Sequence, residues 1–266
     1  MKNYYLGREE AYIASPQVWS FRSVDDIVNG INLRLSNMAG GFPFECSGRV
    51  WKDSERLYLC GEWSHNTGEH CFIQECLLLF TSGFGAKRFG KAKFKNFIRP
   101  DFADFRLQWM LYCVWQKCKG NEDFRKLLLQ IPQDVVLVEN TTTDKWNSAE
   151  IWGCKNEELW NKRLNLETIL MHNHKDMKRK DLKQLINVET NKINDIGVWK
   201  GQNNIGKILM ICRDCLIEGS EPEIDYNLLN KAGIFLFGKR LQLGIPPKEK
   251  QTLKHNIELM DGRVVD

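Results

Sequence analysis

The sequence has no hydrophobic run long enough to cross a membrane. Its longest apolar stretch, Cys76 to Phe80, is far shorter than the roughly 18 residues that a spanning helix needs. The first residues, Met1 to Glu10, are polar and charged and contain no apolar segment of a signal peptide. We therefore expect a cytoplasmic protein with no membrane association.

The cysteines and histidines form neither a disulfide framework nor a complete metal site. The nine cysteines are an odd number at irregular spacings, which indicates reduced thiols in a cytosol. Cys212 and Cys215 form a C-x-x-C pair, but the pair lies in a helical pattern and has no second C-x-x-C to complete a zinc site. His65, His70 and Cys71 are close in sequence without a complete ligand set. We expect no metal and no cofactor.

The composition is that of a globular protein with many aromatic residues. The chain has 266 residues, 42% hydrophobic and 27% charged, which permits one large domain or a smaller domain with additions. Its 14 Phe and nine Trp exceed what a core of this size needs, so some are expected to line a pocket for a flat ligand. The alternative is that these rings are core or partly exposed. The net charge of +4 fits a ligand that carries phosphate.

Local patterns predict helices separated by loops and short strands. Residues 15–45 read as loops and short strands, and Asp53 or Ser54 is a suitable N-cap for the helix that follows. Met110, Val114 and Lys117 recur at helical spacing and fall on one face. Further helices are predicted at 74–80, 106–119, 123–130 (capped by Asn121) and 207–217, with strands at 135–138 and 234–237.

Two segments are unusually rich in lysine. Residues 156–195 form a polar insertion that is helical in part, either a solvated surface or a contact for phosphate or nucleic acid. Residues 87–99 interleave basic residues with Phe, which fits a nucleic-acid strand or an ordinary amphipathic face. We predict a main domain over residues 1–217 and a C-terminal extension, residues 218–266, packed on it.

Three separated parts of the chain contain polar, aromatic and glycine residues that are candidates for a functional site. The first has Asn37 followed by Ser54-Glu55-Arg56. The second has Phe102 followed by a helix with Met110 and Lys117. The third has Trp152-Gly153, and then a glycine turn that leads into Leu209, Met210 and Arg213; the turn contains Gly201, Asn203 and Gly206.

These motifs resemble the YbiA-like, or NADAR, family over roughly residues 34–216. That family has an Asn, a Ser-Glu-His helix start, a Met-x6-Lys-Phe helix, a Trp-Gly and a Gly-x-Asn-x-x-Gly-x2-Leu-Met-x2-Arg element. The resemblance implies a mainly helical multihelical domain with a few short strands, here with the charged insertion and the C-terminal extension. It also implies a hydrolase that cleaves N-glycosidic bonds.

This sequence departs from the family pattern at four places. Ser-Glu-His is Ser54-Glu55-Arg56, Lys-Phe is Lys117-Cys118, and a frequent Trp is Phe102. The acid three residues before Trp-Gly is Ala149, for which Asp144 or Glu150 is a candidate replacement. The choice between these two acids stays open.

Cleavage of a ribose C1′–N bond needs chemical groups that the matched residues supply. Positive charge develops on the ribose, so a carboxylate near C1′ stabilises the transition state. We expect Glu55 and Lys117 to be catalytic and to share one pocket, with Trp152 and Phe102 as aromatic walls. Asn37 and Gly153 complete the expected ligand site, and the Gly201–Gly206 turn would bind phosphate.

Each of these residues also has a purely structural interpretation. Glu55 would then complement a helix dipole, Trp152 would be core, the glycines would form a helix entry, and Lys117 would snorkel to the surface.

Three functional readings follow from the resemblance. The first is an N-glycosidase for ADP-ribosylated guanine in nucleic acid or a related ADP-ribosyl conjugate, for which a cognate ADP-ribosyltransferase toxin is a candidate pathway partner. The second acts on nucleotide-like small molecules, the phosphorylated riboflavin intermediates. The third is a non-catalytic binder of ADP-ribose-like ligands. The charged insertion and the basic segment 87–99 favour a large substrate.

Overall fold

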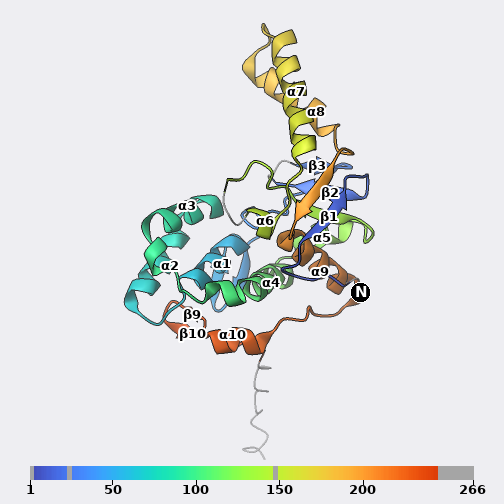
Figure 1. Cartoon of the computed structure of the whole chain (residues 1–266). Coiled ribbons are helices and arrows are strands. Elements are labelled where there is room, and N and C mark those ends of the chain that lie inside the picture. Colours follow the sequence, from blue (N-terminus) through green and yellow to red (C-terminus); the bar gives the residue numbers. More distant parts are fainter. Residues whose placement is uncertain (1–2, 23–25, 146–148, 245–266) are drawn as a thin grey trace, which may run out of the picture.

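The structure, a computed structural model, describes residues 3–22, 26–145 and 149–244, and in these ranges it is mainly helical (Figure 1). The helices are α1 (Ser54–Glu62), α2 (Gly68–Leu79), α3 (Gly83–Lys93), η1 (Lys95–Phe97), α4 (Phe102–Gly120), α5 (Glu122–Gln130), α6 (Ala149–Trp152), α7 (Glu157–Asn173), α8 (Arg179–Asn191), α9 (Asn204–Glu218) and α10 (Tyr226–Ala232). The predicted mainly helical fold with a few short strands is confirmed.

The strands are short and form two-stranded ladders. In the described ranges they are β1 (Glu10–Ile13), β2 (Val18–Phe21), β3 (Ile27–Val28), β4 (Ile31–Asn32), β5 (Phe44–Cys46), β6 (Arg49–Trp51), β7 (Val136–Glu139), β8 (Val198–Gly201), β9 (Phe235–Leu236) and β10 (Lys239–Arg240). β2 pairs with β7 in parallel, and β1 pairs with β8 antiparallel. No helix in the described ranges is both long and apolar enough to span a bilayer.

Helix α1 lies at the centre of the molecule. All nine of its residues are buried, because α4, α2 and α3 all pack against it. Its polar residues therefore need partners inside the protein. Arg56, for example, pairs with Asp53 and donates to the carbonyl of Phe80 at 2.6 Å.

Helix termini follow local capping rules. Asp53, rather than Ser54, caps α1, since its carboxylate accepts from the backbone N–H of Arg56 at 3.0 Å. Asn121 caps α5 as predicted, accepting from the N–H of Phe124 at 2.9 Å. Helix α2 begins at Gly68, earlier than predicted, because Thr67 provides an N-cap there.

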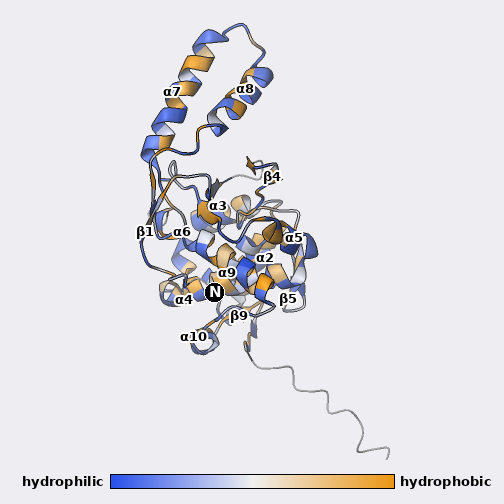
Figure 2. Cartoon of the chain, turned by 90° about the vertical axis from the view of Figure 1, so that its right-hand side faces the viewer, coloured by the Kyte–Doolittle hydropathy of each residue, from blue (hydrophilic) through white to orange (hydrophobic). Residues whose placement is uncertain are grey.

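The charged insertion forms a helical hairpin of α7 and α8 that projects from the body of the molecule in both views (Figures 1 and 2). Leu159 is the one residue of the two helices that is buried. The hairpin therefore contributes little to the main core.

The described part of the C-terminal extension packs on the helical body. Leu229, Ile234 and Leu236 join the main hydrophobic core. Gln74 of α2 donates to the carbonyl of Phe235 at 2.9 Å and accepts from the N–H of Phe237 at 2.7 Å. The remainder of the predicted extension, residues 245–266, lies outside the described residues.

Candidate active site

Glu55 lies in the first turn of α1, where its carboxylate is buried against Asn37. The side-chain amide of Asn37 donates to Oε2 of Glu55 at 2.7 Å. The hydroxyl of Ser54 donates to the other end of that amide, Oδ1, which orients Nδ2 toward Glu55. The structure thus brings together two residues that the motif predicted as site residues.

Lys87 of α3 approaches the second oxygen of this carboxylate. Its Nζ lies 3.3 Å from Oε1 of Glu55. The negative charge of Glu55 is the largest cause that raises the pKa of Lys87, although burial opposes it. Oε1 is buried, and among the described residues its partner is the Lys87 ammonium, with no further hydrogen bond.

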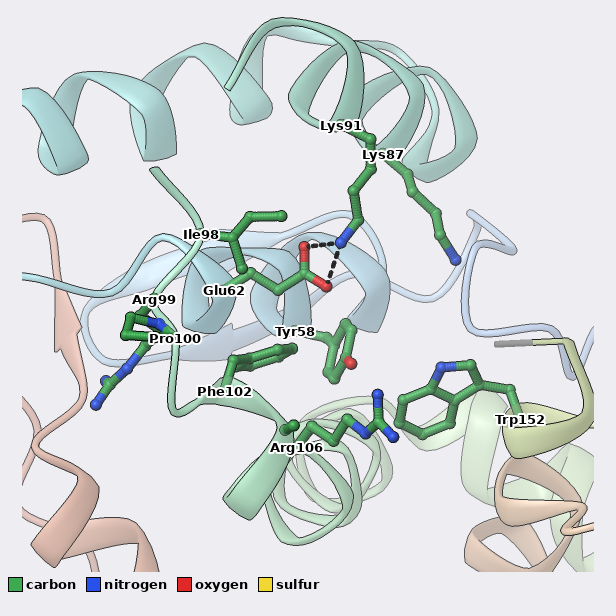
Figure 3. Close-up of a pocket in the computed structure, with 11 residues that line it drawn as sticks. Tyr58, Glu62, Lys87, Lys91, Ile98, Arg99, Pro100, Phe102, Arg106 and Trp152 are labelled. Atoms are coloured by element: carbon green, nitrogen blue, oxygen red, sulfur yellow. Dashed lines mark hydrogen bonds and ion pairs between the residues drawn. The ribbon is translucent and has the colours of Figure 1, made fainter. Parts of the chain in front are cut away.

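Lys87 also lines a pocket of about 360 Å³ with three aromatic walls (Figure 3). The ring of Tyr58 lies 5.3 Å from Phe102 and 5.4 Å from Trp152, nearly perpendicular to the latter. Tyr58 is on α1, three residues after Glu55 and therefore on the same helix face. The predicted Phe102 and Trp152 meet in one pocket, and Tyr58, which sequence reasoning missed, separates them.

Charged side chains line the remainder of the pocket. Glu62, one further turn along α1, pairs with Lys91 at 2.7 Å, and burial raises the pKa of this glutamate. Arg99 pairs with Asp101 at 2.6 Å. The polar lining residues are Tyr58, Glu62, Lys87, Lys91, Arg99 and Arg106.

Glu139, at the end of β7, is a second acid, which the sequence analysis did not name as a site residue. Burial raises its pKa to about 7; the charge of Lys87 opposes this shift and that of Glu55 adds to it. These influences place it in the same electrostatic environment as the Glu55–Lys87 pair. A glutamate directly after the apolar run 135–138 was the signal in the sequence.

Neither acid proposed as a replacement before Trp152 lines the pocket. Asp144 pairs with Arg22 at 2.8 Å. Glu150 is exposed and pairs with Lys155 at 2.7 Å. Each carboxylate is therefore balanced by a cation that does not line the pocket either.

The glycine turn packs closely against the segment that carries Trp152. Gly201 ends β8 with a φ of 151°, and a Cβ at this position would lie 2.3 Å from the carbonyl oxygen of Gly153. A Cβ at Gly206 would lie 2.2 Å from the carbonyl oxygen of Leu137. Glycine is therefore needed at both positions for the backbones to approach.

Asn203 joins the same elements through its side chain. Its Oδ1 accepts from the N–H of Glu139 at 3.1 Å, and its Nδ2 donates to the carbonyl of Leu137 at 2.8 Å. The backbone N–H of Asn203 donates to the carbonyl of Gly153 at 3.3 Å. Asn203, Gly201 and Gly206 do not line the pocket. They hold β7 and the end of α6 together through these close contacts. Phosphate binding by this turn stays a prediction.

Lys117 is buried on α4, with its ammonium over aromatic rings. Nζ lies 3.9 Å from the centre of the Phe124 ring and 5.4 Å from that of Phe42. Burial lowers the pKa of Lys117 to about 8, and the charges of Cys118 and Asp53 oppose that shift. Lys117 does not line the pocket around Trp152, so its predicted sharing of a pocket with Glu55 stays a prediction.

Comparisons with known proteins give structural similarity but no match in sequence. No family model matches this chain, and no curated protein matches it either. The NMR structure of the E. coli protein YbiA is similar, with a TM-score of 0.46 and 20% sequence identity. The aligned region covers 76% of this chain and 86% of that one. Among the described residues, no group of three or more His, Cys, Asp or Glu is arranged to hold a metal ion.

Proposed function

We propose that this protein is an N-glycosidase that hydrolyses a ribose C1′–N bond. The observation that carries the proposal is the buried carboxylate of Glu55, held by Asn37 and Lys87 next to an aromatic pocket. An aromatic pocket accepts a flat heterocycle, and a fixed carboxylate stabilises the positive charge that forms on the sugar. The motif resemblance points to the same reaction.

The proposed reaction needs one carboxylate for the sugar and one proton donor for the leaving base. Glu55 stabilises C1′ as the base departs with the electron pair of the C1′–N bond. Water adds to C1′ as the base leaves. The Glu55 carboxylate takes up the proton that this water loses and passes it to the departing base. Lys117 remains a second catalytic candidate from the motif, with an amine that is partly neutral near pH 8.

The substrate that we propose is ADP-ribosylated guanine in nucleic acid, placed there by an ADP-ribosyltransferase. Support comes from exposed cations on the projecting hairpin, which form no ion pair with any described residue: Lys175, Lys178, Arg179, Lys180 and Lys183. Such cations bind phosphate backbones in a salt-dependent way. One observation favours the binder reading instead: Ala149 stands where the family has an acid, and neither Asp144 nor Glu150 lines the pocket.

The test is release of ADP-ribose from DNA that carries ADP-ribosylated guanine. Wild-type protein is expected to release it, and Glu55→Gln is expected to bind the DNA without release. Phosphorylated riboflavin intermediates form the second substrate arm. Cleavage of those compounds but not of the modified DNA would identify a small molecule, rather than nucleic acid, as the substrate. Binding of ADP-ribose without any cleavage would contradict the proposed enzyme and support a binder.

A further inference from the structure

Arg106 differs from every other cation that lines the pocket, because it has no acidic partner. Lys87 pairs with Glu55, Lys91 with Glu62, and Arg99 with Asp101. No hydrogen bond or ion pair joins the Arg106 side chain to the described residues, and its Nε is a buried donor without an acceptor. The positive charge of Arg106 is therefore unbalanced.

The guanidinium of Arg106 lies on the pocket side of α4. In Figure 3 it extends toward Tyr58 and Trp152, between the aromatic walls. Its charge also acts on the phenol of Tyr58, which is consistent with that position. The group is half-buried, so an anion that reaches it is partly shielded from water. Arg106 lies on α4, one turn after Phe102. Both side chains line the pocket.

We infer that Arg106 binds a phosphate group of the ligand, and that the pocket selects phosphate-bearing nucleotide ligands over uncharged nucleosides. A guanidinium presents several N–H donors in one plane and matches two phosphate oxygens at once. An unpaired buried donor on a charged group is unfavourable until an acceptor satisfies it. This inference rests on the proposed function for the identity of the substrate, but not for the existence of the anion site.

The pocket volume supports a ligand of this kind. A volume of about 360 Å³ is at the lower end of the range for small-molecule sites. It holds a base or ribose between the aromatic walls, with one charged group at Arg106. The glycine turn, predicted from the motif to bind phosphate, does not line this pocket, whereas Arg106 does.

Calorimetric titration of the full chain with three probes tests the inference: ADP-ribose, inorganic pyrophosphate and guanosine. Arg106→Gln is expected to weaken ADP-ribose and pyrophosphate binding by about tenfold or more, and to leave guanosine within about twofold. Arg106→Lys keeps the charge without the planar fork and should fall between. Arg88→Gln is the matched control, since Arg88 is exposed on α3 and outside the pocket.

Three results would overturn the inference. They are an unchanged affinity of Arg106→Gln for both anions, an equal loss of guanosine binding, or no binding of either anion by the wild type at millimolar concentration. A thermal melt confirms that each variant is folded. Arg106-dependent anion binding without any C1′–N cleavage would refute the proposed function alone. Cleavage with an unchanged KM in Arg106→Gln would refute the anion site alone.

Discussion

Replacing Lys117 with methionine is expected to stabilise the protein near neutral pH, because the native ammonium is buried. Burial lowers its pKa from the ordinary 10.5 to about 8. That shift corresponds to about 3 kcal/mol of destabilisation of the charged form in the folded state. The contact between Nζ and the Phe124 ring offsets up to about 2 kcal/mol of this cost. The expected net gain for Lys117→Met is therefore about 1–3 kcal/mol.

The gain should depend on pH with a definite sign. Below about pH 8 the lysine is protonated in both the folded and the unfolded chain, and the full cost of burial is present. Between that pH and 10.5 the unfolded chain binds a proton that the folded chain does not, so the free energy of unfolding rises with pH. The advantage of Lys117→Met is thus greatest near neutral pH and disappears toward the ordinary lysine pKa.

Urea unfolding of both proteins between about pH 7 and 10 measures this difference. The comparison between the two proteins is needed because buried thiols also make stability depend on pH in this range. Burial raises the pKa of Cys60, for example, whereas the same thiol titrates normally in the unfolded chain. This contribution is common to both proteins and cancels in the difference between their unfolding free energies. Lys119→Met, an exposed change on the same helix, is the control and should show little effect. A variant that is less stable than wild type at neutral pH, or a difference independent of pH, would refute the reasoning.

The same variant tests the catalytic assignment of Lys117. A folded Lys117→Met that retains full hydrolysis would identify a structural lysine. Loss of activity in a variant that remains folded, together with a borohydride-trapped adduct in the wild type, would support a covalent role.

Three further predictions concern the walls and supports of the pocket. Trp152→Ala should weaken ligand binding in a titration but cost less than about 3 kcal/mol in a thermal melt, since the ring is only half-buried; a collapsed melt would show that Trp152 is core. Glu55→Gln should lower the hydrolysis rate by about 100-fold or more with ligand binding retained, and full activity on every substrate would contradict its role. Gly153→Ala should destabilise the protein by about 3 kcal/mol in urea unfolding, because the new Cβ would lie 2.3 Å from the carbonyl oxygen of Glu139; an unchanged midpoint would exclude this contact.

Local signals in the sequence were sufficient for most elements and for part of the site. The caps at Asp53 and Asn121 and the helical period of residues 106–119 act within a few residues, so they can be read without a fold. Motif order led to Glu55 with Asn37, which are in contact. It also led to Phe102 and Trp152, which line the same pocket.

Only the tertiary structure determined which charged side chains of the pocket form ion pairs and which one, Arg106, has no acidic partner. The pocket draws its residues from α1, α3, α4 and α6, so no short window of sequence contains its pattern. Lys87 reaches Glu55 from a different helix, whereas Arg106 forms no ion pair with a described residue. Likewise, Lys117 shares the helical stripe of Met110, but packing placed its ammonium over Phe124 rather than in the pocket. Burial and pairing depend on contacts between distant segments, and those contacts form only when the helices pack.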